Sequence, residues 1–291
     1  MNRNRQLALL EGISAGTLFG TAAIFIRMLT DIDVFSIALW RLIIASALMA
    51  IVILIFKRKI SVSLVRSDLK HFLVLGALLG AHFILFVSAV KETTILNATL
   101  LVNTTPIFSM IISVVLYRMK PSRLAIAGIV LSLIGAGFIA YGDAGSGGSA
   151  SLIGDLKATL AAVAEGFYLN YGRERRRQFP LLPTMLLIYL AAAFTVAGAT
   201  VATRTTFKTS ESLGILVPLI GLGILPTALA HTLYFSSLSN LKSFETATMA
   251  LLEPLGATLL GVAVFAEIPA PIFVLGAALM LMGFFSVAAG E

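Results

Sequence analysis

The 291-residue sequence contains no cysteine and little charge, and each absence excludes a class of protein. Without cysteine, the chain forms no disulfide, no thiolate metal site and no catalytic thiol. Charged residues make up 12% of the chain, whereas a soluble domain carries roughly 25%. So few polar side chains cannot cover a water-facing surface, and 58% of the residues are hydrophobic. The composition therefore indicates a membrane protein whose outer surface contacts lipid.

The sequence also lacks motifs of pumps and membrane-embedded enzymes. It has no G-x-x-x-x-G-K-[ST] run for a P-loop ATPase and no H-E-x-x-H pair for zinc. Its three histidines, His71, His82 and His231, leave little material for a Ser-His-Asp set. We therefore predict no catalytic residues, no bound metal and no cofactor. The alternative from another class is a membrane-embedded enzyme acting on lipid precursors, which would need a reactive cluster near one interface.

Long apolar stretches, by contrast, are abundant. A membrane-spanning helix needs about 20 predominantly apolar residues, and ten stretches approach or exceed this length. They predict an all-α integral membrane protein with ten transmembrane helices, at residues 7–27, 34–56, 69–90, 95–117, 122–141, 152–172, 181–203, 214–238, 243–265 and 270–289.

Lysine and arginine are distributed unevenly over the segments between these stretches. With the N-terminus inside, fifteen of them fall in cytoplasmic segments and three, Lys91, Arg204 and Lys208, in exterior loops. Positive residues concentrate on the cytoplasmic side of membrane proteins, so we predict that both termini lie on the cytoplasmic side of the cell inner membrane. The net charge of +7 then reflects orientation, and we expect no nucleic-acid partner.

A sequence repeat divides the ten predicted helices into two sets of five. Gly128 and Gly135 match Gly276 and Gly283, each 148 positions later, and the pattern Ala-His-x-x-x-Phe occurs at residues 81–86 and again at 230–235. Residues 142–151, GDAGSGGSAS, are typical of a flexible linker. We therefore predict a first repeat at 1–141 and a second at 152–291.

The two predicted repeats must run in opposite directions through the membrane. Five is an odd number, so the second set of helices starts from the opposite side to the first. Inverted repeats are typical of secondary transporters, whose substrate site lies between the halves.

Ionisable residues at membrane depth are costly and are candidates for function. Arg41 lies about two turns into the second predicted helix; it either binds a substrate carboxylate or extends to the interface beside Trp40. Glu165 lies in the middle of the sixth helix. It is a candidate to carry a proton or to contact an amine, and the alternative is a structural carboxyl group that is hydrogen-bonded to a neighbouring helix. His82 and His231 occupy matching repeat positions and either line a shared cavity or serve packing.

Two prolines interrupt predicted helices at matching positions. Pro106 and Pro254 each remove a backbone hydrogen bond and free a carbonyl one turn earlier. Broken helices at mid-membrane expose backbone groups to substrate in inverted-repeat transporters. Asn103 and Glu253 are therefore predicted to border a cavity, with a purely structural kink as the alternative.

The full chain resembles the drug/metabolite transporter superfamily, in particular its EamA-type ten-helix exporters. The resemblance rests on the Arg-bearing second helix, Leu39-Trp40-Arg41-Leu42, on Phe19-Gly20 in place of a Trp-Gly, and on residues 247–283 with their proline and spaced glycines. The first half departs from the pattern at Met119, where a Glu is expected. The His-bearing third helix and the aromatic residues look like the YddG-like branch, which implies export of phenylalanine, tyrosine or tryptophan.

Together these observations predict an inner-membrane exporter of amino acids and related small metabolites, most of all aromatic amino acids, that works by alternating access. Exporters of drugs or nucleobases with the same fold are the nearer alternative. The expected partners are a small-molecule substrate, membrane lipids and a second copy, which would bind at the peripheral fifth and tenth helices. The residues predicted to line the substrate site are Trp40, His82, Phe86, Asn103, Glu165, Tyr168, His231 and Tyr234.

Overall fold

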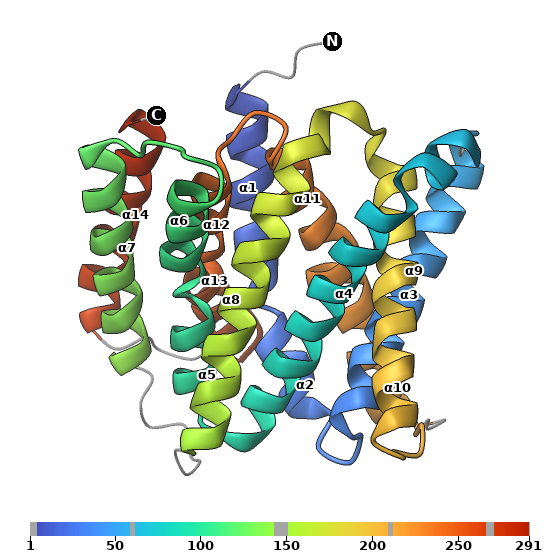
Figure 1. Ribbon diagram of the computed structural model, residues 1–291. Helices are drawn as coiled ribbons and strands as arrows, with labels where there is room; N and C mark the ends of the chain where they lie inside the picture. The colour runs from blue at the N-terminus through green and yellow to red at the C-terminus, as the bar shows by residue number, and fades with distance from the viewer. Residues whose placement is uncertain (1–4, 59–61, 143–150, 209–211, 266–270, 291) are drawn as a thin grey trace.

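The computed structural model describes residues 5–58, 62–142, 151–208, 212–265 and 271–290, and within them all regular secondary structure is helical (Figure 1). Of the predicted linker 142–151, residues 143–150 lie outside the described part. The helices are α1 (Arg5–Phe19), α2 (Ala22–Met28), α3 (Val34–Ile55), α4 (Val62–Glu92), α5 (Ile95–Val102), α6 (Thr105–Val115), α7 (Arg123–Gly142), α8 (Leu152–Arg175), η1 (Arg176–Gln178), α9 (Leu181–Ala202), α10 (Leu213–Leu222), η2 (Gly223–His231), α11 (Thr232–Ser237), α12 (Ser243–Ala250), α13 (Glu253–Phe265) and α14 (Ile272–Gly290).

Many of these helices are long and apolar enough to cross a membrane. Seven candidate spans occur among the described residues: Arg5–Met28, Val34–Ile55, Val65–Glu92, Asn97–Val115, Leu181–Ala202, Leu213–Ser237 and Ile272–Gly290. A shorter apolar helix covers Arg123–Ile139, and α8 has 24 residues. An all-helical protein with several membrane spans is therefore confirmed, while the count of ten spans stays a prediction.

Both interruptions predicted at Pro106 and Pro254 occur. The chain leaves the helical path between α5 and α6 and again between α12 and α13, so each of these spans consists of two short helices. Pro106 and Pro254 each stand at the second residue of the helix that follows, where a missing N–H is tolerated. A third break, between α1 and α2 at Gly20 and Thr21, was not predicted.

The first and last helices bring the two ends of the chain together. Arg5, the first residue of α1, donates a hydrogen bond of 3.2 Å to the carbonyl oxygen of Ala288 in α14. Figure 1 shows both ends at the same end of the helical bundle. The chain between them therefore crosses the bundle an even number of times.

The peripheral pair α7 and α14 packs through glycines from both helices (Figure 1). A Cβ added to Gly135 would lie 2.5 Å from the carbonyl oxygen of Gly276, and one added to Gly128 would lie 2.6 Å from that of Gly283. The order of these contacts shows that the two helices run antiparallel. Because the glycines face each other within one chain, this packing face is unavailable to a second copy.

Helices of the N-terminal half pack largely on helices of the C-terminal half. α4 packs on α8 and α9, while α1 and α3 pack on η2. Close approach again depends on small residues, since a Cβ on Gly76 of α4 would overlap the Cβ of Ala191 in α9. The largest core cluster, which includes Leu42, Phe83 and Tyr189, lies at this seam.

Candidate functional site

A small cavity lies between the two halves, at the points where the helices are broken. Its volume of about 30 Å³ is enough for roughly two water molecules. Its walls come from α1, α2, α3, α4, α5, α8, η2, α12 and α13, several of which contribute residues at a helix end. The residues that line it are Phe19, Ala22, Arg41, His82, Phe86, Val102, Asn103, Glu165, His231, Ala250 and Glu253.

Arg41 supplies a buried positive charge to this cavity. Only 2% of the residue is exposed, so it does not extend to the interface, and that alternative interpretation is wrong. Its Nε donates a hydrogen bond of 2.9 Å to Oγ1 of Thr227, and its Cζ lies 3.7 Å from the ring centre of Phe83. Its Nη1 has no hydrogen-bond partner among the described residues. A buried guanidinium with a free donor is suited to an anionic group of a ligand.

The position of Arg41 depends on a proline in the facing helix. Pro226 lacks an N–H, so the carbonyl of Leu222, four residues earlier, loses the partner it would have in an α-helix. Thr227 replaces that partner, because its Oγ1 donates to the Leu222 oxygen at 2.6 Å and accepts from Arg41. The surrounding residues, Gly223–His231, form a π-helix, a geometry that often marks functional sites.

Glu165 is one of two buried carboxyl groups at the cavity. Oε2 of Glu165, which is 6% exposed, lies 3.1 Å from Oγ1 of Thr105 and 3.8 Å from Nδ1 of His82. Thr105 itself donates to the carbonyl of Val102 at 2.8 Å, the carbonyl that Pro106 leaves without a helical partner. The break between α5 and α6 therefore places a hydroxyl group beside the acid.

Glu253 is the second carboxyl, and it contacts the broken span of the other half. It is 7% exposed, and its Oε2 accepts a hydrogen bond of 3.4 Å from Nδ2 of Asn103. Each of these residues lies next to a break, at the end of α5 and at the start of α13. The two broken helices therefore meet at the cavity, as the sequence predicts.

The two repeated histidines also meet there. The ring centres of His82 and His231 are 6.1 Å apart, in an edge-on arrangement. Nδ1 of His82 lies 3.0 Å from the carbonyl oxygen of Ala161, and because a carbonyl only accepts, this nitrogen carries the proton. Phe86 is stacked on His82 with an interplanar angle of 7°, and Phe19 lies 4.8 Å from the His231 ring. Aromatic rings thus form much of the wall between the charged groups.

Three of the eight predicted site residues do not line this cavity. Trp40 donates its Nε1 hydrogen bond of 3.1 Å to the carbonyl of Lys208 and packs on Phe207, near the end of the bundle. Tyr168 and Tyr234 are fully buried behind the wall; Tyr234 packs edge-on against Phe19 and Tyr168 against Phe235. The other five, His82, Phe86, Asn103, Glu165 and His231, line one cavity, and their role in binding substrate stays a prediction.

Several lining residues were absent from that predicted set. Arg41 and Glu253 were recognised as candidates from their charge at membrane depth. Phe19 was recognised only as part of Phe19-Gly20, yet its place at the end of α1, beside an unpredicted break, puts it in the wall. Ala22, Val102 and Ala250 carry no chemical signal in the sequence, since an apolar residue at a helix end resembles any other core residue.

The comparisons with known proteins identify the class. Residues 6–141 and 152–289 each match the EamA-like transporter family. The chain therefore belongs to this family, and it carries the family unit twice. The two matches enclose the predicted linker, although the exact limits of the two repeats stay a prediction.

Two curated relatives have names that agree with this class. An "uncharacterized transporter" of Archaeoglobus fulgidus is 29% identical over 194 residues, 65% of this chain and 59% of the relative. The "uncharacterized transporter YwfM" of Bacillus subtilis is 26% identical over 207 residues, 70% of this chain and 68% of the relative. The matched region thus spans less than two thirds of the archaeal relative's length.

A solved crystal structure has the same fold. It superposes with a TM-score of 0.82 and 21% sequence identity, over 98% of this chain and 97% of the other. The likeness shows that both chains follow one helical path.

Proposed function

We propose that this membrane transporter exports amino acids, aromatic ones above all, across the cell inner membrane by alternating access. In this proposal the chain forms ten spans in two inverted repeats, with both termini cytoplasmic. The antiparallel packing of α7 and α14 and the common end of Arg5 and Ala288 support the inversion. Exposed apolar side chains on α3, α9 and α14, such as Ile51, Phe194 and Phe285, suit contact with lipid.

The observation that carries the proposal is that one cavity is lined by a guanidinium and by two carboxyl groups. Arg41 offers a free guanidinium donor, whereas Glu165 and Glu253 offer carboxyl groups. An α-amino acid carries a carboxylate and an ammonium on one carbon, and these groups fit such a pair of partners. Burying either charge without its partner would be costly, so the cavity selects for molecules that carry both.

Aromatic cargo is supported by the rings around these charges. Phe19, Phe86 and the imidazoles of His82 and His231 surround the space where a substrate side chain would lie. Contact between aromatic rings adds roughly 0.5–1.5 kcal/mol beyond the burial of area. We therefore expect phenylalanine and tyrosine to be preferred over alanine and serine.

The small volume of the cavity implies that the substrate enters through a different conformation. The cavity has room for roughly two water molecules, whereas an amino acid such as phenylalanine is several times larger. The halves must therefore move apart to admit an amino acid, and alternating access describes such a movement.

The test is counterflow in vesicles containing the purified chain. Vesicles loaded with unlabelled phenylalanine, leucine, a nucleobase or a cationic dye are each diluted into the labelled form of the same compound. We expect exchange of amino acids, fastest for aromatic ones. Exchange of the dye or the nucleobase without exchange of amino acids would replace this proposal by export of drugs or nucleobases.

A further inference from the structure

Two clusters of polar contacts, one at each end of the bundle, lie outside the cavity and join the two halves. The terminal latch is formed by Arg5 and Glu245, at the end where α1 begins and α14 ends. The distal latch is formed by Thr93, Asn97 and Asp155, at the end where α8 begins. The halves are thus connected on both sides of the substrate cavity.

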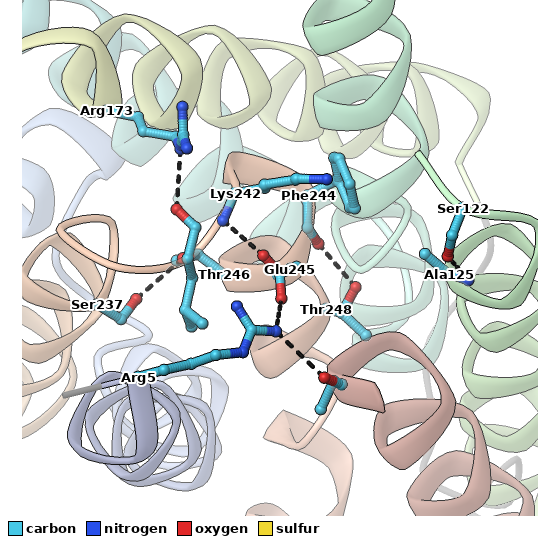
Figure 2. Close-up of polar contacts among 12 residues, drawn as sticks. Arg5, Ser122, Ala125, Arg173, Ser237, Lys242, Phe244, Glu245, Thr246 and Thr248 are labelled. Carbon is cyan, nitrogen blue, oxygen red and sulfur yellow. Dashed lines mark hydrogen bonds and ion pairs between the residues drawn. The ribbon is translucent and has the colours of Figure 1, made fainter. Parts of the chain in front are cut away.

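The terminal latch binds the first residue of α1 to α12 and α14. Glu245 is only 1% exposed; its Oε1 forms an ion pair with Arg5, while its Oε2 accepts from the backbone N–H of Lys242 at 2.7 Å. The same Arg5 nitrogen donates to the carbonyl of Ala288. Arg173 of α8 holds the adjoining loop through the carbonyl of Leu241 at 2.9 Å (Figure 2). A buried carboxylate that loses its cation is strongly destabilised, so this contact stabilises the packing of α1 against α12 at the terminal end.

The distal latch makes the corresponding connection with different chemistry. Oδ1 of Asp155, in the first turn of α8, accepts hydrogen bonds from Oγ1 of Thr93 at 2.7 Å and from Nδ2 of Asn97 at 3.1 Å. Lys157, half a turn further along α8, forms an ion pair with Glu92 at 2.5 Å. The carboxylate here accepts from neutral donors, whereas the carboxylate of the terminal latch pairs with a cation.

The two latches occupy equivalent places in the repeat. Asn97 is the third residue after the cap of α5, Glu245 is the third after the cap of α12, and they are 148 positions apart. Their partners, Asp155 and Arg5, lie in the first turns of α8 and α1, the first helices of the two family-matched segments. Each latch therefore joins the first turn of one half's first helix to the same helix position in the other half, at opposite ends of the bundle.

Each latch is connected to the cavity by continuous helices. α1 runs from Arg5 to Phe19, and α8 runs from Asp155 past Glu165, a distance of about 15–21 Å at 1.5 Å per residue. On the opposing side, α5 and α12 end at Val102 and Ala250, which line the cavity. A shift of these helices around a substrate thus moves the latch residues as well.

We propose that the terminal and distal latches are the two gates of the transporter, and that they open one at a time. Glu245 and Asp155 are positioning residues: neither touches the cavity, and each sets how readily its own end opens. The proposal rests on the proposed function only in requiring alternating access, and it makes no use of the identity of the cargo.

The experiment uses the absence of cysteine from the chain as a clean background. Ala8 lies three residues after Arg5 in α1, and Ala158 lies three residues after Asp155 in α8. Both alanines are fully buried. Single Ala8→Cys and Ala158→Cys variants are placed in lipid nanodiscs, where a maleimide reaches both ends, and the labelling rate is measured. Each is then combined with Glu245→Gln or Asp155→Asn. Glutamine retains an oxygen for the Lys242 amide, so the start of α12 stays capped.

We expect Glu245→Gln to raise the labelling rate of the Ala8→Cys variant by about tenfold, the scale of one charge-assisted hydrogen bond, and to lower that of the Ala158→Cys variant. Asp155→Asn should do the reverse. Arg5→Gln should reproduce Glu245→Gln, whereas the control Arg175→Gln, which removes an exposed ion pair with Asp68, should change neither rate.

The proposal fails if either latch substitution raises both rates together, which would indicate general loosening, or if the rate at the nearer introduced thiol does not change. The result is independent of the cargo. If the two labelling rates change in opposite directions but no amino acid shows counterflow, the proposal of two gates stands and the proposed substrate is rejected.

Discussion

The two halves follow similar helical paths but place different side chains at the cavity. Both have a broken span that meets its counterpart, and both contribute a histidine to the same wall. At matched positions, however, Glu253 stands 148 positions after Thr105, and Tyr189 stands 148 positions after Arg41. The similar backbones create a central space, to which the first half contributes the guanidinium of Arg41 and the second half the carboxyl groups of Glu165 and Glu253. A charged substrate is therefore expected to bind in one orientation.

Arg41 should show the largest effect, because nothing in the second half replaces its charge. Truncating a buried charged partner costs roughly 2–5 kcal/mol, so Arg41→Gln should reduce phenylalanine counterflow by about a hundredfold or more. Arg41→Lys should recover little of it, because lysine lacks the planar donor fork. Initial rates of counterflow at equal protein incorporation measure both variants.

The matched control is Tyr189→Phe. The Tyr189 hydroxyl donates to the carbonyl of Thr227 at 2.8 Å, away from the cavity lining. Its loss costs about 1 kcal/mol of stability and should leave the transport rate of folded protein unchanged. An equal loss of transport in Tyr189→Phe and Arg41→Gln would contradict the claim that Arg41, and not Tyr189, contacts the substrate.

Glu253→Gln should produce the next largest effect. It removes one of two carboxyl groups available to a substrate ammonium while retaining the size of the side chain and an oxygen for Asn103. Loss of one charge-assisted contact corresponds to roughly tenfold in binding, so we expect a rise in the KM for phenylalanine with little change in maximal rate. Asn103→Ala, the control from the first half, should have a smaller effect. The reverse order would remove Glu253 from the proposed ammonium site.

His82→Ala tests the shared wall. His82 links the carbonyl of Ala161 to the cavity and stacks on Phe86, so its removal loosens both a polar and an aromatic contact. We expect export of phenylalanine by cells loaded with phenylalanine dipeptide to fall by several-fold, about 1 kcal/mol, at unchanged expression. Unaltered export would exclude His82 from the site.

The smallest effect on transport should come from the peripheral α7 and α14 pair. A side chain at Gly135 would collide with the backbone of Gly276, whereas Gly137 has open space around it. Gly135→Val should lower the free energy of unfolding by about 1–3 kcal/mol, seen as a lower melting temperature in detergent. Gly137→Val should be neutral by comparison, and transport per folded molecule should be retained in both. A strong transport defect in folded Gly135→Val would mean that this pair takes part in the transport movement.

The sequence predicted the backbone plan better than the details of the site. Hydropathy and the repeated prolines located the helices and both central breaks, because these depend on local chain chemistry. The break after Phe19 and the π-helix at Gly223–His231 were missed, since each arises where a helix adapts to its neighbours.

The same limit explains which site residues were predicted. His82, Asn103 and Glu165 are polar groups in apolar helices, a signal visible in the sequence. Trp40 and Tyr168 were expected in the cavity because of their residue type, but the direction of a side chain around its helix depends on packing. One charged residue, Arg41, had two open interpretations, and only its contacts with Thr227 and Phe83 separate them.

The most direct test of the central claim uses phenylalanine and two analogues, each lacking one charge. Wild-type vesicles loaded with phenylalanine are exposed to labelled phenylalanine, phenethylamine, which lacks the carboxylate, or 3-phenylpropionate, which lacks the ammonium. A cavity in which Arg41 binds the carboxylate and Glu165 or Glu253 binds the ammonium predicts rapid exchange of phenylalanine alone. Equally rapid exchange of phenethylamine would contradict the account, because Arg41 would then have no part in recognising the substrate.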